Sequence, residues 1–143
     1  MIIAVDFDGT IVEHKYPAIG KERTFAIETL KMLQAKGHLL ILWTYRCGEE
    51  LDEAVAFCSN RGLVFYSVNK SFPEETYNED ISRKINADVF IDDRNVGGFP
   101  GWGEIWHMLN AAAPLSEKDS YNALYKQSTM SGFIELIRKI FNK

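Results

Sequence analysis

Residues 1–10 read Met1-Ile-Ile-Ala-Val-Asp-Phe-Asp-Gly-Thr10. The apolar run before Asp6 has the length and uninterrupted hydrophobicity of a strand that is buried on both faces. Asp8 follows Asp6 two positions later. Two carboxylates this close repel each other and resist removal from water. We therefore expect the pair to bind a divalent cation, which needs several oxygen ligands. Gly9 permits a tight turn, and Thr10 offers a hydroxyl and an amide at its mouth.

The bulk properties are those of a single globular domain spanning residues 1–143, with 46% hydrophobic and 25% charged residues. The net charge of −4 excludes a basic footprint for long nucleic acids and disfavours a polybasic membrane contact. Charge appears by residue 6 and no apolar run approaches about 18 residues, so we expect neither a signal peptide nor a membrane span. The cysteines, Cys47 and Cys58, form no CxxC pattern, which favours reduced thiols and a cytoplasmic location.

Apolar runs and amphipathic stretches alternate along the chain. The predicted strands are Ile2–Val5, His38–Trp43, Leu63–Val68 and Ala87–Ile91, and the predicted helices between them are Lys21–Lys36, Gly48–Arg61 and Asn78–Asn86. After a glycine-rich loop over Asn95–Gly103, helices are predicted at Glu104–Ala113 and Ser131–Phe141, in a C-terminal helical extension over 104–143. Strands separated by helices predict right-handed crossovers. We therefore expect an α/β fold: a three-layer, doubly wound, Rossmann-like and mainly parallel sheet with helices on both faces.

Polar residues follow three of the predicted strands directly. Asp6, Thr44 and the pair Asp92-Asp93 all stand at carboxyl ends, which meet at one edge of a parallel sheet and bind ligands there. Asp6 and the acidic pair can hold one Mg²⁺, while Thr44 and Lys84 supply a hydroxyl and a cation for a phosphate dianion. A carboxylate beside the metal can attack phosphorus, and Asp8 can protonate the leaving oxygen.

These residues resemble, in type, order and strand-end placement, the four motifs of the haloacid dehalogenase-like (HAD) hydrolase superfamily. The motifs are Asp6-Phe-Asp-Gly-Thr10, Thr44, Lys84 and Asp92-Asp93, all within residues 1–97. The resemblance implies an aspartyl-phosphate on Asp6, with Asp8 as general acid and base as in the phosphatase branch. It implies phosphoryl binding by Thr44 and Lys84, and Mg²⁺ held by Asp6, the backbone carbonyl of Asp8 and one of the two motif-four acids.

Two positions depart from the family pattern or compete for its roles. The polar residue that often follows the second acid by four positions is Gly97 here, so Asn95 is a candidate replacement and the direct metal ligand is Asp93 or Asp92. Lys70, just after the third predicted strand, competes with Lys84 for the phosphate. Around the catalytic positions we expect Gly9, Thr10, Tyr45 and Arg46 to bind substrate, Arg46 because a guanidinium can clamp an anion with two hydrogen bonds.

The segments 11–20 and 69–83 are too short to form a cap domain, so the chain resembles a capless phosphatase. Resemblance implies an open site, a phosphorylated small-molecule or macromolecular substrate, and a possible homo-oligomer. We predict a Mg²⁺-dependent phosphomonoester hydrolase. One alternative is a phosphatase for nucleotide or nucleic-acid ends, because Ile91-Asp92-Asp93-Arg94 resembles the phosphatase domains of polynucleotide kinases. Another is a receiver-like phosphate-binding module, although Val68-Asn69 lacks the Asp that receivers place after the third strand.

Overall fold

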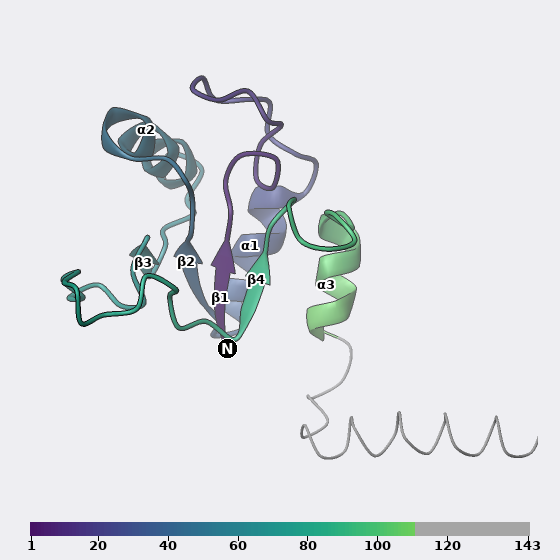
Figure 1. Cartoon of the computed structure of the whole chain (residues 1–143). Helices are drawn as coiled ribbons and strands as arrows, with labels where there is room; N and C mark the ends of the chain where they lie inside the picture. Colours follow the sequence, from purple (N-terminus) through teal and green to yellow (C-terminus); the bar gives the residue numbers. More distant parts are fainter. Residues whose placement is uncertain (111–143) are drawn as a thin grey trace, which may run out of the picture. The chain divides into compact units, whose positions relative to one another are not determined.

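The structure, a computed structural model, describes residues 1–110 of the chain (Figure 1). Residues 1–107 form one compact unit, which contains every predicted site residue, and residues 108–143 are grouped in a second. The predicted helix Ser131–Phe141 and the end of the predicted helix Glu104–Ala113 lie outside the described residues. None of the described helices is both long and apolar enough to cross a membrane.

Four strands and three helices are described. They are β1 (Ile2–Val5), α1 (Ala26–Ala35), β2 (Leu39–Leu42), α2 (Gly48–Ser59), β3 (Ser67–Val68), β4 (Val89–Ile91) and α3 (Trp102–Asn110). The strands form a parallel sheet in the order β3-β2-β1-β4, and their arrows point the same way in Figure 1. The predicted α/β class and parallel sheet are confirmed. Because β2 and β4 flank β1, the chain leaves β1 on one side and returns on the other, as in Rossmann-like sheets.

One face of the sheet packs against helices. Ile3 and Val5 of β1 and Leu40 of β2 are fully buried on this face, and α1 contacts β2 there. The side chains of α1 also reach the segment that follows α2, because Lys31 Nζ donates to the carbonyl of Arg61 at 3.2 Å. Alternate residues of each strand point the other way, toward the second face.

The second face carries a smaller apolar cluster of Ala4, Ile41 and Ile85, with Ile2, Trp43, Ala87 and Phe90 partly buried around it. Ile85 comes from the segment between β3 and β4, for which the sequence predicts a helix over Asn78–Asn86. That prediction is wrong, because the described segment contains turns and no helix. Asn78 Oδ1 accepts the N–H of Asp80 at 2.9 Å and Ser82 Oγ accepts the N–H of Lys84 at 3.2 Å, so local side chains hold amides that a helix would use. Irregular chain therefore covers this face within residues 1–110.

The first predicted helix begins later than expected, at Ala26 rather than Lys21. The residues before it pair with the segment after β1 instead: Val12 and Glu22 form an antiparallel bridge, and Arg23 N–H donates to Ile11 O at 2.9 Å. This pairing closes the base of a loop over residues 13–20, which we call the rim loop. The third strand is also shorter than predicted. It pairs only with β2, through two residues, as an edge strand.

Candidate active site

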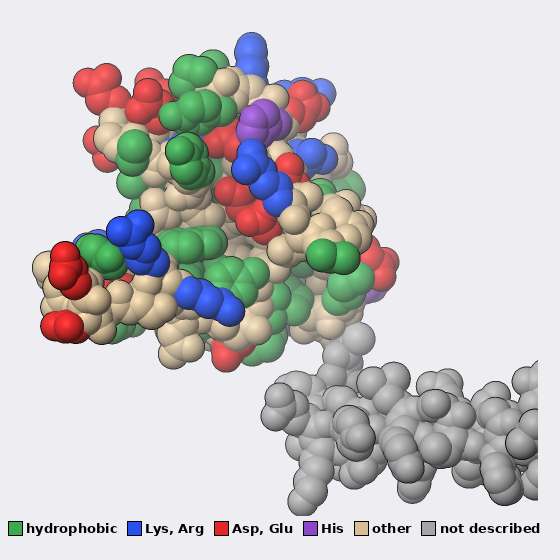
Figure 2. Space-filling view, viewed as in Figure 1, with side chains coloured by type: hydrophobic (Ala, Val, Ile, Leu, Met, Phe, Trp, Pro, Cys, Tyr) green, Lys and Arg blue, Asp and Glu red, His purple; other side chains and the backbone are tan. Residues whose placement is uncertain are grey.

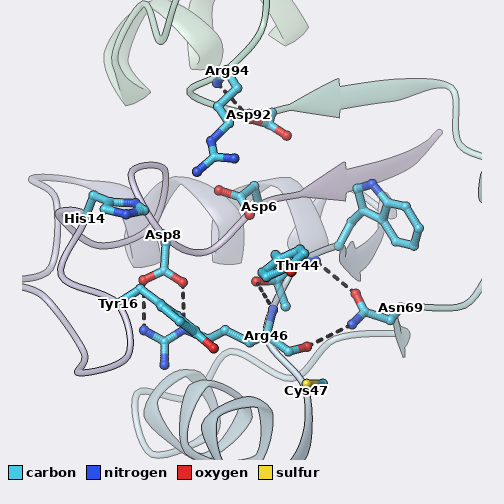
Figure 3. A pocket seen from close by; sticks show the side chains of 12 residues that line it. Asp6, Asp8, His14, Tyr16, Thr44, Arg46, Cys47, Asn69, Asp92 and Arg94 are labelled. Atoms are coloured by element: carbon cyan, nitrogen blue, oxygen red, sulfur yellow. Dashed lines mark hydrogen bonds and ion pairs between the residues drawn. The ribbon is translucent and has the colours of Figure 1, made fainter.

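The residues that follow the four parallel strands meet at one edge of the sheet, around a cleft of about 670 Å³ (Figure 3). Thr44 and Asn69, after β2 and β3, are joined by a hydrogen bond of 2.8 Å from the N–H of Thr44 to Asn69 Oδ1. The cleft is lined by Asp6, Asp8, His14, Tyr16, Trp43, Thr44, Tyr45, Arg46, Cys47, Asn69, Asp92 and Arg94. The predicted convergence of strand ends on one crevice is therefore confirmed.

Three carboxylates stand close together at the junction of β1 and β4. Asp6, Asp92 and Asp93 each offer an oxygen, and these oxygens lie within 4.8 Å of one another. Burial, together with the negative charges of Asp92 and Asp93, raises the pKa of Asp6 to about 7, against 3.8 in its ordinary state. Asp6, the predicted nucleophile, therefore keeps part of its proton near neutral pH unless positive charge lies beside it.

A second observation indicates that a cation fits this cluster. Asp93 Oδ1 is buried and has no hydrogen-bond partner among the described residues. Asp92 uses Oδ1 to accept the N–H of Arg94 at 2.8 Å, which leaves its other oxygen for a ligand. An uncompensated buried carboxylate oxygen beside two more acids is costly, and Mg²⁺ takes such oxygen ligands. The residues therefore suit the predicted magnesium ion, with both motif-four acids close enough to contribute.

Gly9 and Thr10 hold this cluster together rather than facing the cleft. The hydroxyl of Thr10 donates to Asp6 Oδ2 at 3.3 Å and accepts the N–H of Asp93 at 3.1 Å. Gly9 has a φ of +91°, and a Cβ there would overlap the carboxylate of Asp93. No described contact supports the prediction that Gly9 and Thr10 bind substrate, because both are buried and the Thr10 hydroxyl is already engaged. Gly9 and Thr10 instead allow the ends of β1 and β4 to lie close together.

Asp8 points away from the three acids and is held by Arg46. Arg46 Nε donates to Asp8 Oδ2 at 2.6 Å and Arg46 Nη2 donates to Asp8 Oδ1 at 2.8 Å (Figure 3). The Asp8 side chain is 11% exposed at the cleft wall, whereas the Arg46 side chain is fully buried. The Arg46 fork already holds a carboxylate of the chain, so no described contact supports the prediction that Arg46 clamps a substrate anion. The predicted metal contact of Asp8 involves its backbone carbonyl, so the side-chain position leaves it untested.

Thr44 and Tyr45 both line the cleft, as expected of residues that meet a phosphorylated substrate. The Thr44 hydroxyl accepts the N–H of Arg46 at 3.3 Å, and its own proton remains for a ligand. Tyr45 is 92% exposed. Their predicted roles stay predictions, with both side chains in position.

The predicted phosphate-binding lysine is elsewhere. Lys84 and its rival Lys70 are both exposed, and neither lines the described cleft. Lys84 Nζ lies 5.9 Å from the centre of the Phe90 ring, while Lys70 Nζ donates to Pro73 O at 3.5 Å. Without the predicted helix, the segment that carries Lys84 does not bring it to the strand ends. Besides Arg46, which holds Asp8, the described cleft lining includes Arg94, which extends toward Asp6 in Figure 3.

Three further residues support the site without having been predicted to. Asn69 joins the ends of β2 and β3, and its place directly after a strand could have revealed it. Trp102 Nε1 donates to Thr10 O at 3.0 Å in the interior, a contact across 92 residues with no local signal. Tyr16 lies over the Arg46 guanidinium. Asn95, the candidate replacement for the polar residue absent at Gly97, donates instead to Phe90 O at 3.1 Å.

Comparison with known proteins identifies one relative of known structure. A conserved protein from Bacteroides thetaiotaomicron is 58% identical to this chain, with a TM-score of 0.75, over 85% of this chain and 97% of the other. The chain belongs to the same family as this conserved protein. No protein-family model matches the chain, and no curated protein does. The relationship carries no activity over to this chain, so function is inferred from the site.

Proposed function

We propose that this protein is a Mg²⁺-dependent phosphomonoester hydrolase that acts through an aspartyl-phosphate on Asp6. The observation that carries the proposal is the cluster of Asp6, Asp92 and Asp93, which offer oxygens within 4.8 Å of one another. In this cluster Asp93 Oδ1 is buried and has no hydrogen-bond partner within residues 1–110. A structural cluster of acids would have satisfied that oxygen with a donor. An open cleft lies beside the cluster, and its wall carries a fourth carboxylate, that of Asp8, which favours a catalytic site over a purely structural metal site.

The metal would be held by Asp6, Asp92 and Asp93. When bound, Mg²⁺ supplies positive charge that keeps Asp6 ionised near neutral pH and neutralises the phosphoryl oxygens. The donors that this chain adds are the Thr44 hydroxyl and the Arg94 side chain, both of which line the cleft. Hydroxyl and guanidinium donors of this kind stabilise the charge on a transferring phosphoryl group.

The two aspartates of β1 and its turn divide the chemistry. An oxygen of Asp6 attacks phosphorus, and Asp8 gives a proton to the leaving oxygen as the ester bond breaks. Asp8 then takes a proton from the water that attacks the aspartyl-phosphate, which restores Asp6 and releases phosphate. The positions of the side chains support this division, because Asp6 lies in the acidic cluster and Asp8 stands at the cleft wall, outside that cluster.

The proposal is tested by hydrolysis of 4-nitrophenyl phosphate with and without Mg²⁺. We expect Mg²⁺-dependent turnover that Asp6→Asn abolishes. The matched control is Asp52→Asn, which removes an exposed carboxylate from α2 and should leave turnover unchanged. Full activity of Asp6→Asn would overturn the nucleophile assignment.

A second measurement separates a hydrolase from a receiver-like module, which would accept a phosphoryl group on Asp6 without steady turnover. Beryllofluoride mimics such a phosphoryl group, so an adduct on Asp6 is expected in wild type and in Asp8→Asn. Turnover of phosphate esters should be much slower in Asp8→Asn than in wild type. Adduct formation in a wild-type protein without turnover of any phosphate ester would favour the receiver-like module.

A further inference from the structure

Arg46 is a buried cation whose five N–H donors all have acceptors. Nε and one Nη2 proton hold the two oxygens of Asp8 at 2.6 and 2.8 Å. The remaining donors go to backbone carbonyls: Nη2 to Ala18 at 2.9 Å, and Nη1 to Pro17 at 2.9 Å and, more weakly, to Glu50 at 3.5 Å. A guanidinium satisfied in this way has no donor left for a substrate.

These contacts join three segments of chain. Asp8 belongs to the turn after β1, Pro17 and Ala18 belong to the rim loop, and Glu50 belongs to the first turn of α2. The rim loop is already closed at its base by the pairing of Val12 with Glu22, so Arg46 fixes its far part. The loop in turn places His14 and Tyr16 on the cleft lining.

Two aromatic rings confine the guanidinium as well. Its carbon lies 5.1 Å from the centre of the Phe7 ring and 5.3 Å from that of Tyr16. Close contact with aromatic rings on this scale suits a planar guanidinium better than a lysine ammonium. With both rings and five hydrogen bonds in place, Asp8 and the rim loop share one arrangement relative to β2 and α2.

We propose that Arg46 is a positioning residue, which holds the carboxylate of Asp8 and the rim loop in the arrangement needed for proton transfer at the cleft. This inference rests on the proposed phosphatase function. Arg46 does not touch the substrate and keeps its own charge throughout. Asp8 has about four lone-pair sites and Arg46 uses two, so an oxygen of Asp8 can still carry the proton that moves.

The proton balance is as follows. In the first step the Asp6–phosphorus bond forms, the ester bond breaks, and the proton of Asp8 goes to the leaving oxygen. In the second step water attacks phosphorus, its proton goes to Asp8, and the Asp6–phosphorus bond breaks. Loss of the fork lets Asp8 rotate away from both oxygens, so Arg46 variants should lose activity in the same reactions as Asp8 variants.

The test compares Arg46→Gln, Arg46→Lys, Asp8→Asn and the double variant Asp8→Asn/Arg46→Gln on two substrates. Glycerol phosphate has a leaving oxygen that needs a proton, and 4-nitrophenyl phosphate has one that does not. We expect Arg46→Gln to lower kcat/KM for glycerol phosphate by roughly 10- to 100-fold, a part of what general acid catalysis provides, and to lower it much less for 4-nitrophenyl phosphate. In the Asp8→Asn background the same change should cost less than about threefold, because the residue through which Arg46 acts is already absent.

The matched control is Arg61→Gln. Arg61 also pairs with an acid, at 2.8 Å from Glu22, and lies over an aromatic ring, but it is partly exposed and does not line the cleft. Its loss should lower kcat/KM equally little for both substrates. If Arg46→Gln does not fold, Arg46→Lys replaces it in the same cycle, since an ammonium keeps the charge near Asp8 but cannot reproduce the fork.

The inference would be overturned if Arg46→Gln lowered kcat/KM equally for both substrates and had the same effect in the Asp8→Asn background as in wild type. That result would show that Arg46 only supports the fold. That result is distinct from failure of the proposed function, in which wild type would hydrolyse neither substrate and both proposals would fall. Parallel leaving-group dependence of Arg46→Gln and Asp8→Asn, with a non-additive double variant, would support it.

Discussion

Replacing Asp6 by asparagine should change how the stability of the metal-free protein depends on pH. The asparagine has the same shape and can still accept the hydrogen bond from the Thr10 hydroxyl, but it carries no charge. In wild type, burial and the charges of Asp92 and Asp93 raise the pKa of Asp6 to about 7. The variant therefore removes an acid whose ionisation the fold resists.

The sign follows from proton binding in the two states. The folded protein holds the Asp6 proton more tightly than the unfolded chain, where the pKa is 3.8. The stabilisation from this group is therefore complete below pH 3.8 and is lost progressively as the pH rises to about 7. The separation of about 3 between the two pKa values corresponds to a total loss of up to about 4 kcal/mol. Of this, roughly 2–3 kcal/mol falls between pH 5 and pH 8.

The assay is urea unfolding of wild type and Asp6→Asn in EDTA at pH 5 and pH 8. The free energy of unfolding of the variant, minus that of wild type, should increase by about 2–3 kcal/mol from pH 5 to pH 8. This change does not depend on what the amide itself contributes, because that part is the same at both pH values. Asp52→Asn controls for the removal of a negative charge. A difference between Asp6→Asn and wild type that stays constant with pH would refute the assigned burial and charge repulsion.

Two more predictions concern the acidic cluster. Mg²⁺ at 100 times its dissociation constant should stabilise wild type by about 2.7 kcal/mol at pH 8, and Asp93→Asn much less, in thermal unfolding; an equal rise in both would place the ion elsewhere. Gly9→Ala should lower the free energy of unfolding by about 1–3 kcal/mol, because the Cβ meets the Asp93 carboxylate and φ is +91°. Gly103→Ala, in α3 with open space around it, should be neutral or stabilising by up to about 1 kcal/mol, and urea unfolding of both variants checks the contrast.

The strand ends were predictable because their signals are local. Continuous apolar runs at Ile2–Val5 and around Leu40 predict buried strands, and parallel pairing then places Asp6, Thr44 and Asp92 at one edge whatever the details between them. The absence of a helix over Asn78–Asn86 was not predictable from the sequence pattern alone. Asn78 and Ser82 accept nearby backbone N–H groups there, and such turns compete with a helix at little cost.

The roles of the basic residues Arg46 and Lys84 were harder to predict from the sequence. The sequence around Arg46 does not indicate that it is buried, since four of its five side-chain hydrogen bonds go to acceptors 38 residues away at Asp8 and 28 and 29 residues away at Ala18 and Pro17. From the sequence alone, a guanidinium beside a predicted phosphate site can bind either substrate or a carboxylate of the chain, and only the structure shows that Arg46 pairs with Asp8. Lys84 was expected at the site because it precedes the fourth strand at the distance usual for the family, whereas the irregular segment that carries it leaves it exposed and off the described cleft lining.

The sequence by itself determined the class of fold and which carboxylates meet, since hydrophobic periodicity and parallel strand direction depend on residues close together in the chain. Only the tertiary structure decided what each polar group does at that edge. It turned Gly9 and Thr10 inward against Asp93, left Asp93 Oδ1 without a donor among the described residues, and committed Arg46 to Asp8. The physical reason is that a side chain's partner and burial are set by segments far apart in sequence, which only the packed chain brings within hydrogen-bonding distance.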